Sequence, residues 1–227
     1  MRRIVDRDLE SLREMSLRMG TLAEGIVSKA LKALAEADLE LCREVQADDL
    51  DIDRLDVAID AAVLELLATK APVASDLRFV LATKAIATDL ERVGDLARNI
   101  AKSAARLAEA PRVEIPAKLD VLAGESQRLL RKALDAYADT DAERARRVLE
   151  QDDVIDDSER RVIRDALAEI TAHPDRSPQE IDLIMIAKNL ERVGDHATNI
   201  AEDVILIAEA RNLKHSAKLR AASEGSS

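Results

Sequence analysis

Apolar residues recur along most of this chain at alternating steps of three and four, which is the period of a helix that buries one face. The clearest run passes Ile86, Leu90, Val93, Ala97 and Ile100. Alternation of this kind is typical of helices that pack side by side in a bundle. We therefore predict an all-α protein.

The prolines divide this pattern into segments, because proline is poorly tolerated inside a helix. We predict six helices. The first three run from about residue 5 to 37, from an N-cap at Asp38 to residue 71, and from Ser75 or Asp76 to about 109. The last three run from about 118 to 138, from a cap at Thr140 or Asp141 to 172, and from a capping box at Ser177 to about 211. Three helices precede the proline-containing linker at 110–116 and three follow it. We predict two tandem, pseudo-symmetric three-helix bundles, residues 1–112 and 113–213, with a disordered tail at 214–227; a single six-helix array fits the same apolar pattern.

One phrase occurs twice. Residues 90–95, Leu-Glu-Arg-Val-Gly-Asp, are followed by Asn-Ile-Ala at 99–101, and the same letters stand at 190–195 and 199–201. An internal repeat of this length indicates that a structural unit has been duplicated. Gly94 and Gly194 cost up to about 1 kcal/mol each relative to alanine inside a helix, so we expect a neighbouring element to pack closely there.

Composition narrows the classes of function. The formal net charge of −11 opposes binding to nucleic acid or to an anionic membrane and fits cations or a basic partner. The single cysteine, Cys42, forms no intrachain disulfide and suits a reducing cytoplasm. Acid follows the first residues too soon for a signal peptide, and no stretch of about 18 uncharged apolar residues spans a membrane. We expect a cytoplasmic protein.

The repeated phrase also carries carboxylates that lie off its apolar seam. Glu91 and Asp95 are neighbours on one helix face, and Glu191 and Asp195 repeat the arrangement. Like charges at this spacing repel by a few tenths of a kcal/mol, so their presence in both copies suggests a bound cation. The alternative is a solvated acidic face relieved by neighbouring arginines. Further pairs at the same spacing precede each copy: Asp49 with Asp53, and Asp153 with Asp157.

Packing of neighbouring helices would gather these carboxylates into an oxygen-rich cluster, which suits Mg²⁺, Ca²⁺, Mn²⁺ or iron. One cysteine and three histidines are too few for zinc sites of the Cys/His kind. Asn99 and Asn199 continue the acidic face, and His196 is a possible additional ligand or a support for one. The sequence holds no nucleophile–base pair, phosphate-binding glycine loop or ferritin-like Glu-x-x-His pattern, so we expect no enzymatic activity.

The doubled motif, the aspartate pairs and the segment 71–78 before the first copy resemble the PhoU family of phosphate-uptake regulators. The resemblance covers roughly residues 5–211. It implies two similar three-helix bundles with surface metal clusters of Fe, Mn, Mg, Ca or Zn. Carried over residue by residue, it implies as ligands Asp49, Asp53, Glu91, Asp95, Asp153, Asp157, Glu191 and Asp195. Leu96 stands where family members often have histidine, and Arg78, in a segment that the second bundle lacks, is the candidate for partner binding.

In function, the resemblance implies a metal-binding negative regulator of phosphate-starvation (Pho regulon) signalling that also modulates uptake. Its partners would be the ATPase subunit of the phosphate ABC transporter and a phosphate-sensor histidine kinase. Members are often homodimers, in the cytoplasm or peripherally at the membrane. Two alternatives remain open at this point: a protein that stores or buffers divalent metal or iron, and an acidic helical scaffold without metal.

Overall fold

In the computed structural model of this chain, residues 4–211 are described, and every regular element among them is a helix. The elements are α1 (Ile4–Glu36), α2 (Leu39–Lys70), α3 (Ser75–Glu109), α4 (Ala117–Asp139), α5 (Ala142–Leu149), α6 (Asp152–Ala172), the 3₁₀ turn η1 (Pro174–Arg176) and α7 (Ser177–Glu209). The tail predicted at 214–227 lies outside the described residues. None of the described helices combines the length and apolar character that a membrane crossing requires.

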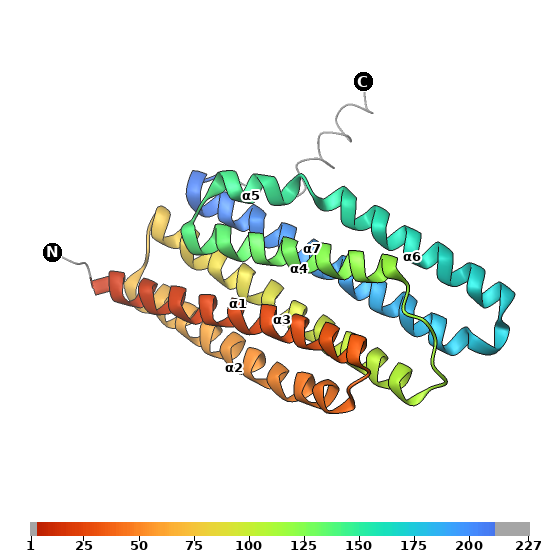
Figure 1. Cartoon of the computed structure of the whole chain (residues 1–227). Coiled ribbons are helices and arrows are strands. Elements are labelled where there is room, and N and C mark those ends of the chain that lie inside the picture. Colours follow the sequence, from red (N-terminus) through yellow and green to blue (C-terminus); the bar gives the residue numbers. More distant parts are fainter. Residues whose placement is uncertain (1–3, 212–227) are drawn as a thin grey trace, which may run out of the picture.

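The predicted all-α fold of two three-helix bundles is confirmed. Helices α1, α2 and α3 pack on one another, and α4 packs with α7 and with the pair α5 and α6. The long helices α3 and α7 lie side by side and antiparallel in the middle, with α2 at one edge and α6 at the other (Figure 1). The two copies of the repeated motif therefore meet at the centre of the molecule. The division into units 1–112 and 113–213 stays a prediction, because buried residues of both bundles form one continuous core.

One predicted helix, the fifth, is two helices in the structure. Asp141 caps α5, as its sequence context predicted, with Oδ1 accepting from the N–H groups of Glu143 and Arg144 at 2.9 and 3.0 Å. The chain then turns at Glu150 and Gln151 before α6 begins. Neither proline nor glycine marks this break, so the apolar pattern predicted one continuous helix.

The predicted caps at other helix ends have mixed outcomes. Asp38 caps α2 as expected, accepting from the N–H groups of Glu40 and Leu41 at 2.8 and 3.1 Å. The capping box predicted at Ser177 is wrong, because Ser177 is already helical and its Oγ donates to the carbonyl of Pro174 at 2.6 Å. The turn η1 leads the chain into α7 in its place.

Three hydroxyl groups tie the two bundles together inside the core. Tyr137 of α4 is buried, and its hydroxyl lies 2.7 Å from Ser16 Oγ of α1 and 3.2 Å from Thr83 Oγ1 of α3. A buried polar group is costly unless it finds hydrogen-bond partners, and these three satisfy one another. The cluster therefore links the second bundle to two helices of the first.

Candidate functional site

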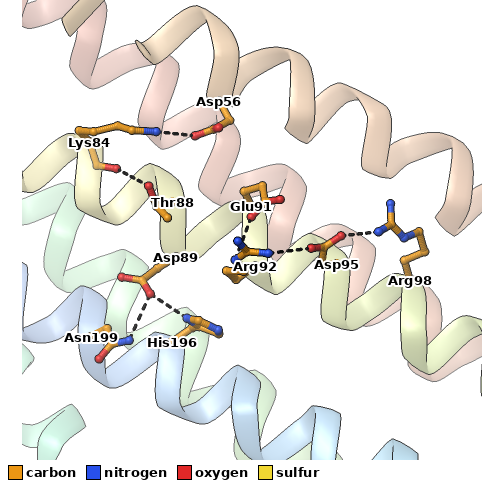
Figure 2. Close-up of polar contacts among 10 residues, drawn as sticks. All are labelled: Asp56, Lys84, Thr88, Asp89, Glu91, Arg92, Asp95, Arg98, His196 and Asn199. Atoms are coloured by element: carbon orange, nitrogen blue, oxygen red, sulfur yellow. Dashed lines mark hydrogen bonds and ion pairs between the residues drawn. The ribbon is translucent and has the colours of Figure 1, made fainter.

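The repeated motif divides between core and surface in both helices. The apolar positions of the first copy, Leu90, Val93, Ala97 and Ile100, are fully buried, and so are their counterparts 100 residues later. Glu91 and Asp95 lie on the other side of α3, on its outer face toward α2 (Figure 2). The motif thus serves two purposes, with one face that folds and one that presents carboxylates.

In the first copy, arginines neutralise these carboxylates. Arg98, one turn after Asp95, binds Asp95 through one guanidinium nitrogen and the buried Asp49 of α2 through another. Arg92 bridges Glu91 at 3.4 Å and Asp95 at 3.3 Å (Figure 2). Three of the four predicted ligands of the first copy are therefore already paired within the chain.

The fields of these groups show that the acids do gather between α2 and α3. Burial raises the pKa of Glu91; the charge of Asp95 adds to the rise, Arg92 opposes it, and the charges of Asp56 and Asp53 contribute less. Burial also raises the pKa of Asp49, against the opposing charge of Arg98. Asp53 therefore lies within the field of the cluster, as predicted, and Asp56 belongs to it as well.

Two basic residues of this site escaped the sequence analysis. Arg98 is described above, and Lys84 of α3 reaches across to Asp56 at 3.1 Å and Asp60 at 2.5 Å on α2. Both side chains lie at helical spacing from the motif acids, with Arg98 three residues after Asp95 and Lys84 seven before Glu91. That spacing was the signal that could have identified them as neighbours of the carboxylates.

In the second copy, the structure places other acids beside Glu191 than the predicted pair. The neighbours on α6 whose charges act on Glu191 are Glu159 and Asp156. Asp153 and Asp157 are exposed, and Arg160 on the same helix binds both Asp157 and Asp156 at 3.0 Å. The structure therefore does not bring Asp153 and Asp157 to the motif.

Packing against the motif glycines explains this shift of register. A Cβ on Gly94 would meet Ile52 at 3.1 Å, and one on Gly194 would meet Ile155 at 2.8 Å. Ile155 stands 103 residues after Ile52, so Asp156 is the structural counterpart of Asp53. The predicted pair assumed a register one residue further along α6. The close packing expected at both glycines is confirmed.

The acids of the second copy are neutralised only in part, with Arg160 bound to Asp156 at 3.0 Å and the charges of His196 and Arg192 opposing the rise in the pKa of Asp195. Burial, with the charges of Asp195, Glu159 and Asp156, raises the pKa of Glu191 to about 7, and Lys188 opposes this only weakly. Lys188 Nζ binds the buried Glu159 at 3.1 Å. The position that matches Arg98 holds Thr198, whose hydroxyl donates to the backbone carbonyl of Asp195 at 2.8 Å.

Two predicted supporting residues of the second site face the other way. His196 Nδ1 lies 2.7 Å from Asp89 Oδ1 on α3, and the Asn199 amide donates to the same oxygen at 3.1 Å (Figure 2). Both side chains therefore bind at the contact between α3 and α7 rather than supporting the acids that face α6. Asn99, the counterpart of Asn199 in the first copy, is exposed.

The predicted partner-binding residue, Arg78, lies in the first turn of α3. Its side chain is half-buried, and its Nε is buried without a hydrogen-bond partner within the described part of the chain. A role in partner binding stays a prediction.

The fit of a metal ion differs between the copies. Among residues 4–211, no three His, Cys, Asp or Glu side chains converge closely enough to hold one as they stand. The first copy already holds guanidinium groups at Asp49 and Asp95, and so fits an added cation poorly. In the second, Glu191 and Asp195 supply hard oxygen donors for such a cation, and Asp156 and Glu159 would join them on releasing Arg160 and Lys188. These four residues are the candidates for holding it.

Comparison with known proteins points to one family. The PhoU domain model matches twice, at residues 16–104 and 119–204. A phosphate-specific transport system accessory protein PhoU homolog of Zymomonas mobilis is 35% identical over 223 residues, which cover 97% of this chain and 94% of that protein. The crystal structure of PhoU from Pseudomonas aeruginosa superposes with a TM-score of 0.88 at 32% identity, covering 91% of this chain and all of that one. A phosphate transport system regulatory protein PhoU from Streptococcus pneumoniae gives 0.82 at 29% identity, covering 91% of this chain and 98% of the other.

Proposed function

This chain belongs to the PhoU family, and we propose that it is an accessory protein of phosphate-specific transport that represses the phosphate-starvation response. The observation that carries the proposal is the match over nearly the whole length of relatives so named, with both copies of the repeated unit included. A regulatory role agrees with a site built from acids and arginines on long helices.

The proposed mode of action is contact with other proteins. We propose as partners the ATPase subunit of a phosphate ABC transporter and a phosphate-sensor histidine kinase, with the chain acting as a homodimer in the cytoplasm. The net charge of −11 and the acidic faces of α2 and α6 favour basic surfaces on such partners. Arg78, at the start of α3, is part of the proposed contact surface of the first bundle.

Cation binding is proposed for the second copy of the motif. Glu191 is partly buried among three other carboxylates, so a divalent cation there would relieve repulsion that Lys188 and Arg160 offset only in part. Such an ion supplies positive charge and open coordination positions, which a phosphate-bearing group or an acidic partner residue can fill. Glu191 and Asp195 of α7 and Asp156 and Glu159 of α6 would hold it from two helices.

Deletion of the gene tests the regulatory role. In medium rich in phosphate, the deletion strain should express alkaline phosphatase constitutively, and a plasmid copy of this chain should restore repression. Unchanged repression in the deletion strain would contradict the proposal. Altered tolerance to metals with normal repression would support storage of metal instead.

A further inference from the structure

In the first copy of the motif, a side chain of the protein supplies the positive charge between the carboxylates. The Arg98 guanidinium lies between Asp49 on α2 and Asp95 on α3, with a separate nitrogen donating to each carboxylate. Asp49 is 1% exposed, so its charge depends on this partner rather than on water. Figure 2 shows Arg98 extending from α3 to Asp95, on the face that carries Glu91 and Arg92.

The place of Asp49 is itself tightly defined. A Cβ on Gly94 would stand 2.8 Å from Asp49 Oδ1, so the absence of a side chain at Gly94 is what admits this carboxylate against α3. At Gly194 the nearest atoms belong to Ile155, the counterpart of Ile52, which also lies against Gly94. Both glycines thus admit an isoleucine, and Gly94 admits the Asp49 carboxylate as well.

The second copy lacks the arginine that this arrangement needs. Thr198 stands at the matching position, and it is too short to reach α6 and carries no charge. Arg192 is exposed, Arg160 binds Asp156 on its own helix, and Lys188 of α7 binds Glu159 on α6. The two copies therefore share their acids and differ in whether one guanidinium binds carboxylates of both helices at once.

We propose that Arg98 takes the place of a metal ion in the first copy, so that this copy binds no cation and the two halves of the protein are inequivalent. The inference deepens the cation binding proposed above and adds the residue that decides which copy takes part. The guanidinium binds two carboxylates at once and is part of the chain, one helical turn from Asp95. It therefore competes with any free ion for these carboxylates. A metal ion that displaced the guanidinium would leave its positive charge to find another place on a face that already carries several charged side chains.

The test measures how many Mn²⁺ ions the full-length chain binds, by calorimetry and by the electron paramagnetic resonance signal of free Mn²⁺. In the native chain, Asp195→Asn should abolish binding and Asp95→Asn should leave it unchanged. Arg98→Thr, which copies the second motif, should add one ion per chain, and Asp95→Asn in that background should remove it again. Arg43→Thr, which deletes an exposed arginine that pairs with Glu40 on its own helix, is the matched control and should leave the count unchanged.

Two controls keep the test decisive. Circular dichroism should show that each variant retains its helices, and Arg98→Lys, which keeps a positive charge, should bind no additional ion. If Arg98→Thr does not fold, Asp95→Asn and Asp195→Asn in the native background still decide the matter. Loss of bound ion in Asp95→Asn would then overturn the proposal.

Failure of this inference can be told apart from failure of the proposed function. If each of Asp95→Asn and Asp195→Asn removes an ion from the native chain, Arg98 does not exclude metal and the inference is wrong. The same holds if a folded Arg98→Thr binds no more than the native chain. If the native chain binds none and Arg98→Thr binds one, the role of Arg98 is supported, while cation binding by the second copy is refuted.

Discussion

Replacing Glu191 by glutamine removes a charge that the fold holds in an unfavourable place. Burial and the neighbouring acids raise the pKa of Glu191 from 4.5 to about 7, so the folded chain retains a proton there that the unfolded chain releases. Below about pH 4.5 both states are protonated and the shift has no effect on stability. Stability is then lost as the pH rises from 4.5 through 7, and above 7 the full penalty applies.

The size of this penalty follows from the shift. One pKa unit corresponds to about 1.4 kcal/mol, so the rise from 4.5 to about 7 sets an upper limit of about 3 kcal/mol. Glu191 is only partly buried, and water and salt screen its repulsion from the other acids. We therefore expect Glu191→Gln to raise the free energy of unfolding by about 1–2 kcal/mol at pH 8 relative to its effect at pH 4.5.

Urea unfolding followed by circular dichroism, in EDTA and at several pH values, measures this difference. Glu91→Gln is the matched variant and should gain less, because Arg92 lies 3.4 Å from Glu91 and would lose that partner. Addition of Mn²⁺ at pH 8 should stabilise the native chain and leave Glu191→Gln unaffected. A difference between native and variant that does not grow between pH 5 and 8 would refute the reasoning.

The remaining predictions concern stability and use the same unfolding assay. Gly94→Ala should destabilise the fold by about 1–2 kcal/mol, because the new Cβ meets a carboxylate held by an arginine as well as Ile52, whereas Gly194→Ala meets the terminal methyl of Ile155 and should cost less; equal effects would contradict this. Asp89→Ala should cost about 2–3 kcal/mol by leaving the polar groups of α7 that it binds without an acceptor; an unchanged midpoint would count against a role in joining the bundles. Tyr137→Phe should cost about 1–2 kcal/mol, since two buried hydroxyls lose a partner, and full stability of this variant would show that the hydroxyl cluster is dispensable.

The helices and their pairing could be predicted because their causes are local. The steps of three and four mark the buried face, and proline and Asp38 mark helix ends. Each of the six helices could therefore be predicted from a short stretch of sequence. The break between α5 and α6 could not be predicted in this way, since Glu150 and Gln151 are compatible with a continuing helix. The helices on the two sides of this break, α5 and α6, both pack against α7.

The site was predicted in part, and its errors share one origin. Glu91 and Asp95 could be placed from spacing along a single helix. Which residues of α6 face Glu191 depends on how two helices slide along each other, and that is set by contacts such as Gly194 with Ile155. A slip of one residue was enough to select Asp153 and Asp157, which the structure turns toward solvent.

Contacts between distant segments were beyond the reach of the sequence for the same reason. Asp49 and Arg98 are 49 residues apart, and Asp89 and His196 are 107 apart. In the sequence His196 is the neighbour of Asp195. The antiparallel packing of α3 on α7 instead places its side chain within hydrogen-bond distance of Asp89. The repeat therefore indicated a duplicated unit correctly, while the differences between its copies emerged only from the packing.

We expect this chain to act on phosphate transport by direct contact with the transport machinery. Affinity purification of the tagged chain from cells grown in high phosphate, with the transporter ATPase subunit quantified in the eluate, tests it most directly. The ATPase subunit should be retained well above the level in an untagged control. Recovery at the control level, from cells in which both proteins are present, would contradict it.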